Sequence, residues 1–150
     1  MIVVVMVLEI LAILANLVLP MTQDASLHGR AAEIAHEMVQ VSDASLRVRG
    51  MRSDWPDVPA VGSPPAEIVS QMPPGFTFTH ADYHFEWTRW SITDPAQLGL
   101  QQTDPAGVTV VTDDPRLAAL VARELPAGRI RFTAGDRTTL VIDGSVPSAN

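Results

Sequence analysis

The chain opens with an apolar run, Met1–Pro20, that limits the folds it can adopt. Within this run only Glu9 and Asn16 are polar. A helix rises about 1.5 Å per residue, so a segment of this length spans roughly the 30 Å hydrocarbon core of a bilayer. A backbone surrounded by lipid has to satisfy its own hydrogen bonds, and a helix does so within one segment. We therefore predict a helix over 1–20 that is either inserted in a membrane or buried in an assembly.

The sequence around this run favours a retained anchor over a cleaved secretory signal. Arg30 is the first basic residue, whereas a signal has a basic region before its apolar core. The apolar run also exceeds the roughly 7–15 residues of a signal core, and no Ala-x-Ala cleavage site precedes the polar sequence that follows. We expect a retained span, whose orientation the arginine pattern does not set.

The two polar residues within the run each have two explanations. Glu9 would lie about 12 Å along a helix from Met1, and a carboxylate at the centre of a bilayer costs roughly 2.5–3.5 kcal/mol on insertion scales. It either meets a charged or hydrogen-bonding partner in a neighbouring subunit, which would set axial register, or stays protonated or snorkels near a helix end. Asn16 either hydrogen-bonds to another helix or lies near the far interface, and we favour the interface. Both are candidate assembly residues within the membrane.

An amphipathic stretch, residues 21–50, follows Pro20. Its apolar stripe recurs at helical spacing: Leu27, Ala31, Ile34, Met38, Val41, Ser45 and Val48. Ser45 is the weak position of this stripe, and Gly50 is a plausible helix stop. A proline inside a helical pattern kinks a helix more often than it ends one. We therefore predict one long, bent helix over 1–49, apolar first and then amphipathic.

Residues 51–75 form a connector that is too rich in proline for a regular element of any length. Its prolines are Pro56, Pro59, Pro64, Pro65, Pro73 and Pro74. A short helix can form over 65–72, with Ser63 as its N-cap. We expect Trp55 to fix the connector to the core.

Residues 76–144 have the pattern of a small, mostly antiparallel sheet with one additional short helix. We predict strands over 76–79 and 83–92 with a turn at 80–82, and apolar residues of the second strand alternate with polar ones. A loop over 93–107 leads to a buried strand at 108–112. A helix then starts at Pro115 behind an aspartate cap, and strands over 129–133 and 138–142 form a hairpin. Residues 145–150 are a polar tail. The predicted fold class is α+β.

Composition argues against several classes of function. The chain carries 10 basic residues, all of them arginine, against 17 acidic ones, for a net charge of −7. An acidic chain without a basic run argues against nucleic acid and against an anionic membrane surface as partners. Cysteine is absent, which removes disulfides, thiolate zinc sites and cysteine nucleophiles together. The sequence has no Gly-x-Ser-x-Gly elbow, P-loop or Gly-x-Gly-x-x-Gly motif. We predict neither enzymatic activity nor a cofactor.

One set of residues has the spacing of a metal site. His80, Asp82, His84 and Glu86 alternate, so a single strand would place them on one face, where a His-x-His pair can hold a metal. The predicted turn at 80–82 would break that face, and we favour a solvated face opposite the aromatic side chains of the strand. The loop aspartates match no calcium-binding pattern. No metal is assigned.

Three neighbouring residues at the end of the same strand have two explanations. Trp87, Arg89 and Trp90 can stack on a ligand or form a cation–π pair. We favour a tryptophan of the sheet core beside a surface arginine. Trp90 falls off the alternation of the strand, which indicates a bulge or an edge.

The order of these segments resembles that of type IV pilins and of the pseudopilins of type II secretion systems. The resemblance depends on three short motifs: Met1-Ile2-Val3-Val4-Val5, Ile10-Leu11-Ala12 and Val18-Leu19-Pro20. They look like the hydrophobic signature of that family, and the resemblance covers about residues 1–48; beyond them it is architectural. The family's leader and processing site would lie upstream of Met1, so we assign neither cleavage nor N-methylation. Glu9 falls where the family usually has a glycine, so it is not assigned the role of the family's early glutamate.

The resemblance implies a structural subunit of an envelope filament, a type IV pilus or a type II secretion pseudopilus. The helix over 1–20 would wait in the cytoplasmic (inner) membrane, with the domain on the periplasmic side. An inner-membrane assembly platform would then extract it, and other copies or related pilin-like subunits would replace lipid around it. The alternative is a single-pass membrane-anchored extracytoplasmic binding or sensor domain. A small membrane-tethered enzyme, which needs a convergent polar pocket, is the weakest hypothesis.

Overall fold

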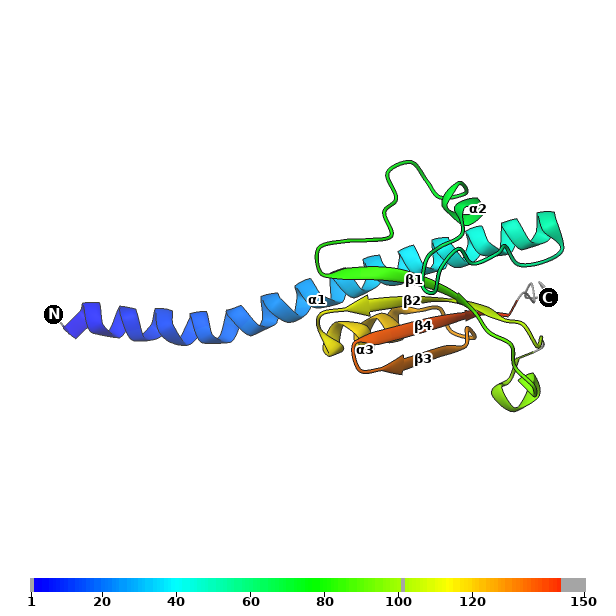
Figure 1. Ribbon diagram of the computed structural model, residues 1–150. Helices are drawn as coiled ribbons and strands as arrows, with labels where there is room; N and C mark the ends of the chain where they lie inside the picture. Colours follow the sequence, from blue (N-terminus) through cyan, green and yellow to red (C-terminus); the bar gives the residue numbers. More distant parts are fainter. Residues whose placement is uncertain (1, 101, 144–150) are drawn as a thin grey trace.

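The structure is a computed structural model that describes the backbone of residues 2–100 and 102–143, and the side chains of these residues from Asp24 onward. It has an α+β fold, as predicted. One long helix packs on a four-stranded antiparallel sheet, and short helices complete the domain (Figure 1).

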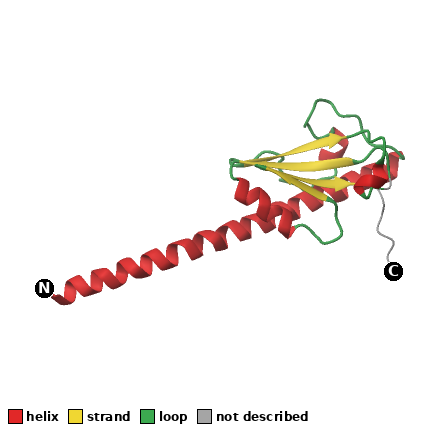
Figure 2. Cartoon of the chain, turned by 90° about the horizontal axis from the view of Figure 1, so that it is seen from below, coloured by secondary structure: helices red, strands yellow, loops and turns green. Residues whose placement is uncertain are grey.

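The long helix α1 runs from Ile2 to Arg52 as one element. Its first part projects beyond the rest of the domain, and its second part lies against the sheet (Figures 1 and 2). The helix passes the predicted stop at Gly50 and ends where Ser53 adopts a left-handed conformation with φ of 62°. A glycine inside a helix costs only about 1 kcal/mol. The arginines Arg49 and Arg52 in the last turn offset part of that cost by interacting with the helix dipole.

The predicted apolar stripe of α1 is confirmed from residue 31 onward. Its members Ala31, Ile34, Met38, Val41, Ser45 and Val48 are all buried, and Leu27 is half-buried. Ala35, Ser42 and Ala44 are buried beside the stripe. The buried surface is wider than predicted because α1 is covered by α2 and α3 as well as by the sheet.

The sheet has the order β1-β2-β4-β3, and every neighbouring pair is antiparallel. Its strands are β1 (Tyr83–Arg89), β2 (Ala106–Thr112), β3 (Arg131–Ala134) and β4 (Arg137–Ile142). Along β1, buried and half-buried residues alternate as predicted. The buried face packs on α1 and α3, and we call the opposite face of the sheet its open face.

Helix α3 (Pro115–Glu124) begins as the sequence predicts. The Asp114 side chain accepts a hydrogen bond of 2.8 Å from the backbone N–H of Arg116, and Pro115 occupies the first turn. The Asp114 carboxylate thus pairs one backbone N–H that has no partner within the helix. Pro115 has no backbone N–H, so its position in the first turn leaves no further donor without a partner. Asp113 does not cap the helix; its own N–H donates to the carbonyl of Asp82.

The prediction of a strand over 76–79 is wrong. This segment forms only an isolated bridge between Thr79 and His84, and the Phe78 carbonyl accepts from the N–H of Phe85. The Gly62 carbonyl accepts similarly from Trp87. The connector and the segment over 76–79 therefore cover the outer edge of β1 at separate points. Edge coverage of this kind blocks pairing with another strand.

Several boundaries also differ from the predicted ones. Helix α2 covers only Ala66–Val69, with Pro65 rather than Ser63 at its N-cap. Strand β1 ends at Arg89 rather than at residue 92, and the loop after it contains a short 3-10 helix, η1 (Pro95–Leu98). Strand β2 starts two residues early, at Ala106. The turn between β3 and β4 is shorter than predicted and consists of residues 135–136.

Trp87 lies at the centre of the core and is fully buried. Trp55 of the connector packs edge-on against it, with ring centroids 6.1 Å apart, and donates its indole N–H to the Asp104 carbonyl at 2.7 Å. The prediction that Trp55 fixes the connector to the core is confirmed. The Trp87 indole donates to the hydroxyl of Ser45 at 3.1 Å. The weak position of the helical stripe is thus the hydrogen-bond partner of the central tryptophan.

Candidate interaction surfaces

The apolar segment Met1–Pro20, with its candidate assembly residues Glu9 and Asn16, lies outside the residues whose side chains the structure describes. Within the part of the chain with described side chains, no helix combines the length and apolarity needed to cross a membrane. The surfaces described below all belong to the globular domain.

A polar cluster joins α1 to the start of β1. The Tyr83 hydroxyl donates to the Glu37 carboxylate at 2.9 Å, and the His80 ring stacks on Tyr83 with centroids 4.2 Å apart. Burial and the hydrogen bond to Glu37 raise the pKa of Tyr83 above its ordinary value of about 10. Next to this cluster, Arg30 pairs with Asp82. These contacts fix the loop before β1 to the helix, so we assign the cluster a structural role.

The four residues with metal-site spacing separate into two groups. His80 and Asp82 lie in the loop before β1 and turn toward α1, where His80 Nε2 is 3.8 Å from Glu37 Oε2. His84 and Glu86 lie on the open face, where His84 Nε2 is 3.5 Å from Glu86 Oε1. Among the described residues, no group of three potential ligands is arranged to hold a metal ion. The loop before β1 therefore separates His80 and Asp82 from the strand face that carries His84 and Glu86.

The residues at the end of β1 also separate. Trp87 is core, and the Arg89 guanidinium lies 3.4 Å from both Asp54 and Asp104 on the surface. Trp90 follows the strand and lies over the backbone of Gly107 in β2. A Cβ at Gly107 would be 2.6 Å from Trp90 Cζ3, so the indole occupies space that only glycine leaves free.

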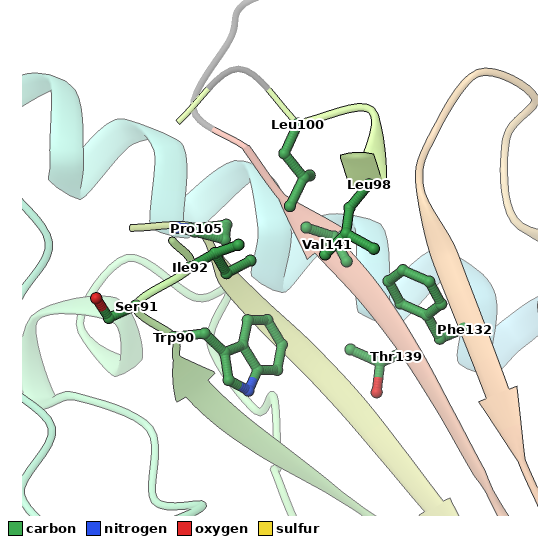
Figure 3. Close-up of a pocket in the computed structure, with 9 residues that line it drawn as sticks. All are labelled: Trp90, Ser91, Ile92, Leu98, Leu100, Pro105, Phe132, Thr139 and Val141. Atoms are coloured by element: carbon green, nitrogen blue, oxygen red, sulfur yellow. The ribbon is translucent and has the colours of Figure 1, made fainter. Parts of the chain in front are cut away.

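Trp90 forms one wall of a cavity of about 340 Å³ on the open face, which we call the apolar trough. It is lined by Trp90, Ser91, Ile92, Leu98, Leu100, Pro105, Phe132, Thr139 and Val141 (Figure 3). Trp90 and Phe132 lie on opposite sides of Thr139 and Val141, which form the floor. Phe132 is 50% exposed and Leu98 is 48% exposed, so the trough is open to solvent. Cavities of this size and lining are typical of binding sites.

The floor changes from apolar to polar along β4. The Thr139 hydroxyl is 2.7 Å from that of Thr109 on β2, and Arg137 pairs with Glu86 at 2.8 Å further along the open face. The open face therefore has an apolar end and a polar end. Sequence reasoning missed the trough. It placed Gly107 in a loop rather than in β2, and its one signal was Trp90, which falls off the alternation of β1.

Comparisons of the chain with known protein families, with curated proteins and with solved structures gave no match.

Proposed function

We propose that this chain is a pilin-like structural subunit of an envelope filament, of the type IV pilus or type II secretion kind. The observation that carries the proposal is the continuity of α1. One helix runs from Ile2 to Arg52, yet only its second half belongs to the domain core (Figure 2). The projecting half carries the apolar run Met1–Pro20. A projecting apolar helix needs an apolar environment, such as lipid or other helices, that its own domain does not provide.

Two apolar environments suit such a helix, one before filament assembly and one after it. Before assembly, lipid of the cytoplasmic membrane surrounds residues 1–20, whose length matches a hydrocarbon core of about 30 Å. After assembly, the same segments of other copies, or of related pilin-like subunits, replace the lipid. Apolar helices associate in lipid through close packing and through hydrogen bonds between helices. Glu9 and Asn16 are the candidate residues for such hydrogen bonds. An inner-membrane assembly platform would drive the exchange, with the domain on the extracytoplasmic side.

The buried stripe of α1 attaches the helix firmly to the rest of the domain. Ile34, Met38 and Val41 are fully buried in the core that α1 forms with the sheet and the short helices, so α1 is held both along and around its axis. A neighbour that grips the projecting half therefore positions the whole domain. This coupling is what a filament subunit requires, because its outer surface has to repeat regularly.

The absence of cysteine allows a direct test by cross-linking. An Ala12→Cys variant should form disulfide-linked dimers between neighbouring helices in the native envelope under mild oxidation. An Asp57→Cys variant, in an exposed position of the connector, is the matched control and should stay monomeric. Equal cross-linking of both variants, or none at residue 12 in cells that assemble filaments, would contradict the proposal.

Glu9 provides a second test. Glu9→Ala should reduce filament or secretion-complex formation by a large factor while leaving membrane insertion intact, and Glu9→Gln should retain part of the assembly if a hydrogen bond is sufficient. Normal assembly of Glu9→Ala would remove Glu9 from the mechanism without affecting the role of the helix.

The apolar trough favours a second candidate function, a single-pass anchored extracytoplasmic binding or sensor domain. Its volume of about 340 Å³ and its mainly apolar lining, with Trp90 and Phe132 as aromatic walls, are typical of a ligand-binding site. In this function the chain acts as a monomer, so the Ala12→Cys variant should not cross-link at any stage.

A further inference from the structure

A second cavity, which we call the basic pocket, lies where α3 packs on α1 and has a volume of about 350 Å³. Its lining includes Asp24, Leu27 and His28 of α1 and Arg116, Leu120 and Arg123 of α3. The two leucines are half-buried, and the four ionisable residues are exposed. The basic pocket therefore combines an apolar interior with a charged rim.

Arg116 and Arg123 are the unusual members of this rim. Seven residues, or about two helical turns, separate them, so they lie on the same face of α3. The ion pairs of the described residues use other arginines: Arg30, Arg52, Arg89, Arg129 and Arg137. Neither Arg116 nor Arg123 forms an ion pair with a described carboxylate. The basic pocket therefore presents two guanidinium groups to an anion from outside the domain.

The acidic groups near the pocket do not neutralise both arginines. Asp24 is the one acidic residue among the described residues that line it. Glu124 lies nearby and is engaged with His28, whose Nδ1 is 3.8 Å from Glu124 Oε1. Salt screens exposed charges beyond about 8 Å. A ligand in the pocket therefore interacts with these local groups more than with the net charge of −7, which argued against an anionic membrane surface for the chain as a whole.

The basic pocket also lies close to the end of the apolar run. Asp24 follows Pro20 by four residues and His28 follows it by eight, which corresponds to about 6 and 12 Å along the helix axis. Figure 1 shows α3 at the end of the domain from which the projecting half of α1 leaves. The polar headgroups of a bilayer extend about 5–8 Å beyond each side of its hydrocarbon core. With residues 1–20 in a bilayer, the pocket lies at the level of the headgroups or just above them.

We propose that the basic pocket binds an anionic phospholipid of the membrane that holds residues 1–20, and that Arg116 and Arg123 donate hydrogen bonds to its phosphate. Guanidinium groups bind phosphate oxygens through paired N–H donors. Leu27 and Leu120 provide the apolar surface for the carbons next to the headgroup. The inference rests on the membrane placement of residues 1–20, which both candidate functions share. Lipid is favoured over an acidic segment of a second copy, because lipid surrounds residues 1–20 before any assembly.

Lipid retention by the full chain tests the proposal. The chain is reconstituted in vesicles of equal amounts of phosphatidylglycerol and phosphatidylcholine, extracted in a mild detergent, and measured by native mass spectrometry. Phosphatidylglycerol should be retained in preference, because the choline group offsets the phosphate charge of the other lipid. An arginine near anionic lipid contributes a factor of about five in binding, so Arg116→Gln and Arg123→Gln should each lower the ratio of the two retained lipids about five-fold. Asp24→Asn should raise that ratio, because the Asp24 carboxylate repels phosphate.

Matched controls separate the pocket from a general effect of charge. Arg131 is also exposed and forms no ion pair with a described carboxylate, but it lies on β3 outside the pocket, so Arg131→Gln should leave the ratio unchanged. Asp57→Asn, in the exposed connector, is the corresponding control for Asp24→Asn. Equal retention of the two lipids by the native chain, or an equal loss of preference in Arg131→Gln, would overturn the proposal.

Flotation with vesicles of phosphatidylcholine alone tests the membrane placement separately. A chain that floats but retains both lipids equally overturns the lipid site and leaves the placement intact, whereas a chain that does not float overturns both.

Two other occupants of the pocket have their own signatures in the mass spectra. Glycerol phosphate, which carries the phosphate without acyl chains, should displace phosphatidylglycerol only in large excess; displacement at equal concentration would mark a site for a soluble phosphate. Lipid-free dimers that disappear in Arg116→Gln/Arg123→Gln would mark an acidic segment of a second copy as the occupant. Either result would overturn the proposal.

Discussion

Replacing Ser45 by alanine tests how much the hydrogen bond between Ser45 of α1 and Trp87 of β1 contributes to stability. The Ser45 hydroxyl accepts from the Trp87 indole at 3.1 Å and donates to the Val41 carbonyl at 2.8 Å, and all three residues are buried. Ser45→Ala leaves the indole N–H without a partner in a site that water does not reach. A buried unsatisfied donor costs about 1–3 kcal/mol.

A smaller effect opposes this cost. Alanine is a better helix former than serine by about 0.5 kcal/mol, and a serine that bonds back to the preceding turn strains a helix slightly. We therefore expect Ser45→Ala to lower the free energy of unfolding by about 1–2 kcal/mol. For a domain of this size such a loss lowers Tm by about 3–8 °C.

A double-mutant cycle separates the hydrogen bond from general packing. Trp87→Phe removes the N–H donor, so Ser45→Ala should cost about 1 kcal/mol less in the Trp87→Phe background than in the native one. Ser42→Ala is the control, because Ser42 is equally buried but its hydroxyl lies 3.5 Å from Arg129 Nη1, a long contact. Near-ultraviolet circular dichroism of the full chain in detergent follows unfolding. Equal costs of Ser45→Ala in both backgrounds would refute the reasoning.

The remaining predictions concern separate parts of the domain. Gly107→Ala should displace Trp90 and lower Tm, because its Cβ would clash with the indole, with Trp90 Cζ3 only 2.6 Å away. Acrylamide quenching of the full chain reports the displacement, and unchanged quenching would contradict the prediction. Tyr83 is the single tyrosine, so absorbance at about 295 nm should show its ionisation above its ordinary pKa of about 10. The folded state then binds more protons than the unfolded one above that pH, so stability should fall as pH rises from about 10, less steeply in Glu37→Gln. A fragment that starts at Thr22 should be soluble and folded by circular dichroism, and its aggregation would show that the projecting half of α1 belongs to the core.

The sequence correctly predicted those helices and strands whose pattern of residues lies within one continuous segment. The stripe from residue 31 to residue 48 is buried because helical spacing alone decides which residues share a face. The alternation of β1 and the Asp114 cap of α3 are equally local. The segment over 76–79 was predicted wrongly as a strand because its aromatic composition favours strands, whereas the prolines before it and its position along the edge of β1 leave it only isolated backbone bonds.

The interaction surfaces depend on pairings between distant segments, which a single sequence does not reveal. Ser45 looked like a defect of the stripe, because its partner Trp87 is 42 residues away in the sequence. The apolar trough needs the register that places Trp90 over Gly107, and it needs the insertion of β4 between β2 and β3, which brings Phe132 opposite. Neither pairing follows from composition or periodicity.

The continuity of α1 has a geometric consequence for any assembly that grips its projecting half. A helix turns about 100° and rises about 1.5 Å per residue. A slip of one residue in the packing of neighbouring helices would therefore hardly move the domain along the axis, but it would swing the open face of the sheet, with the apolar trough, through more than a quarter of a turn. The register of the helix contacts thus decides which surface of the domain faces outward.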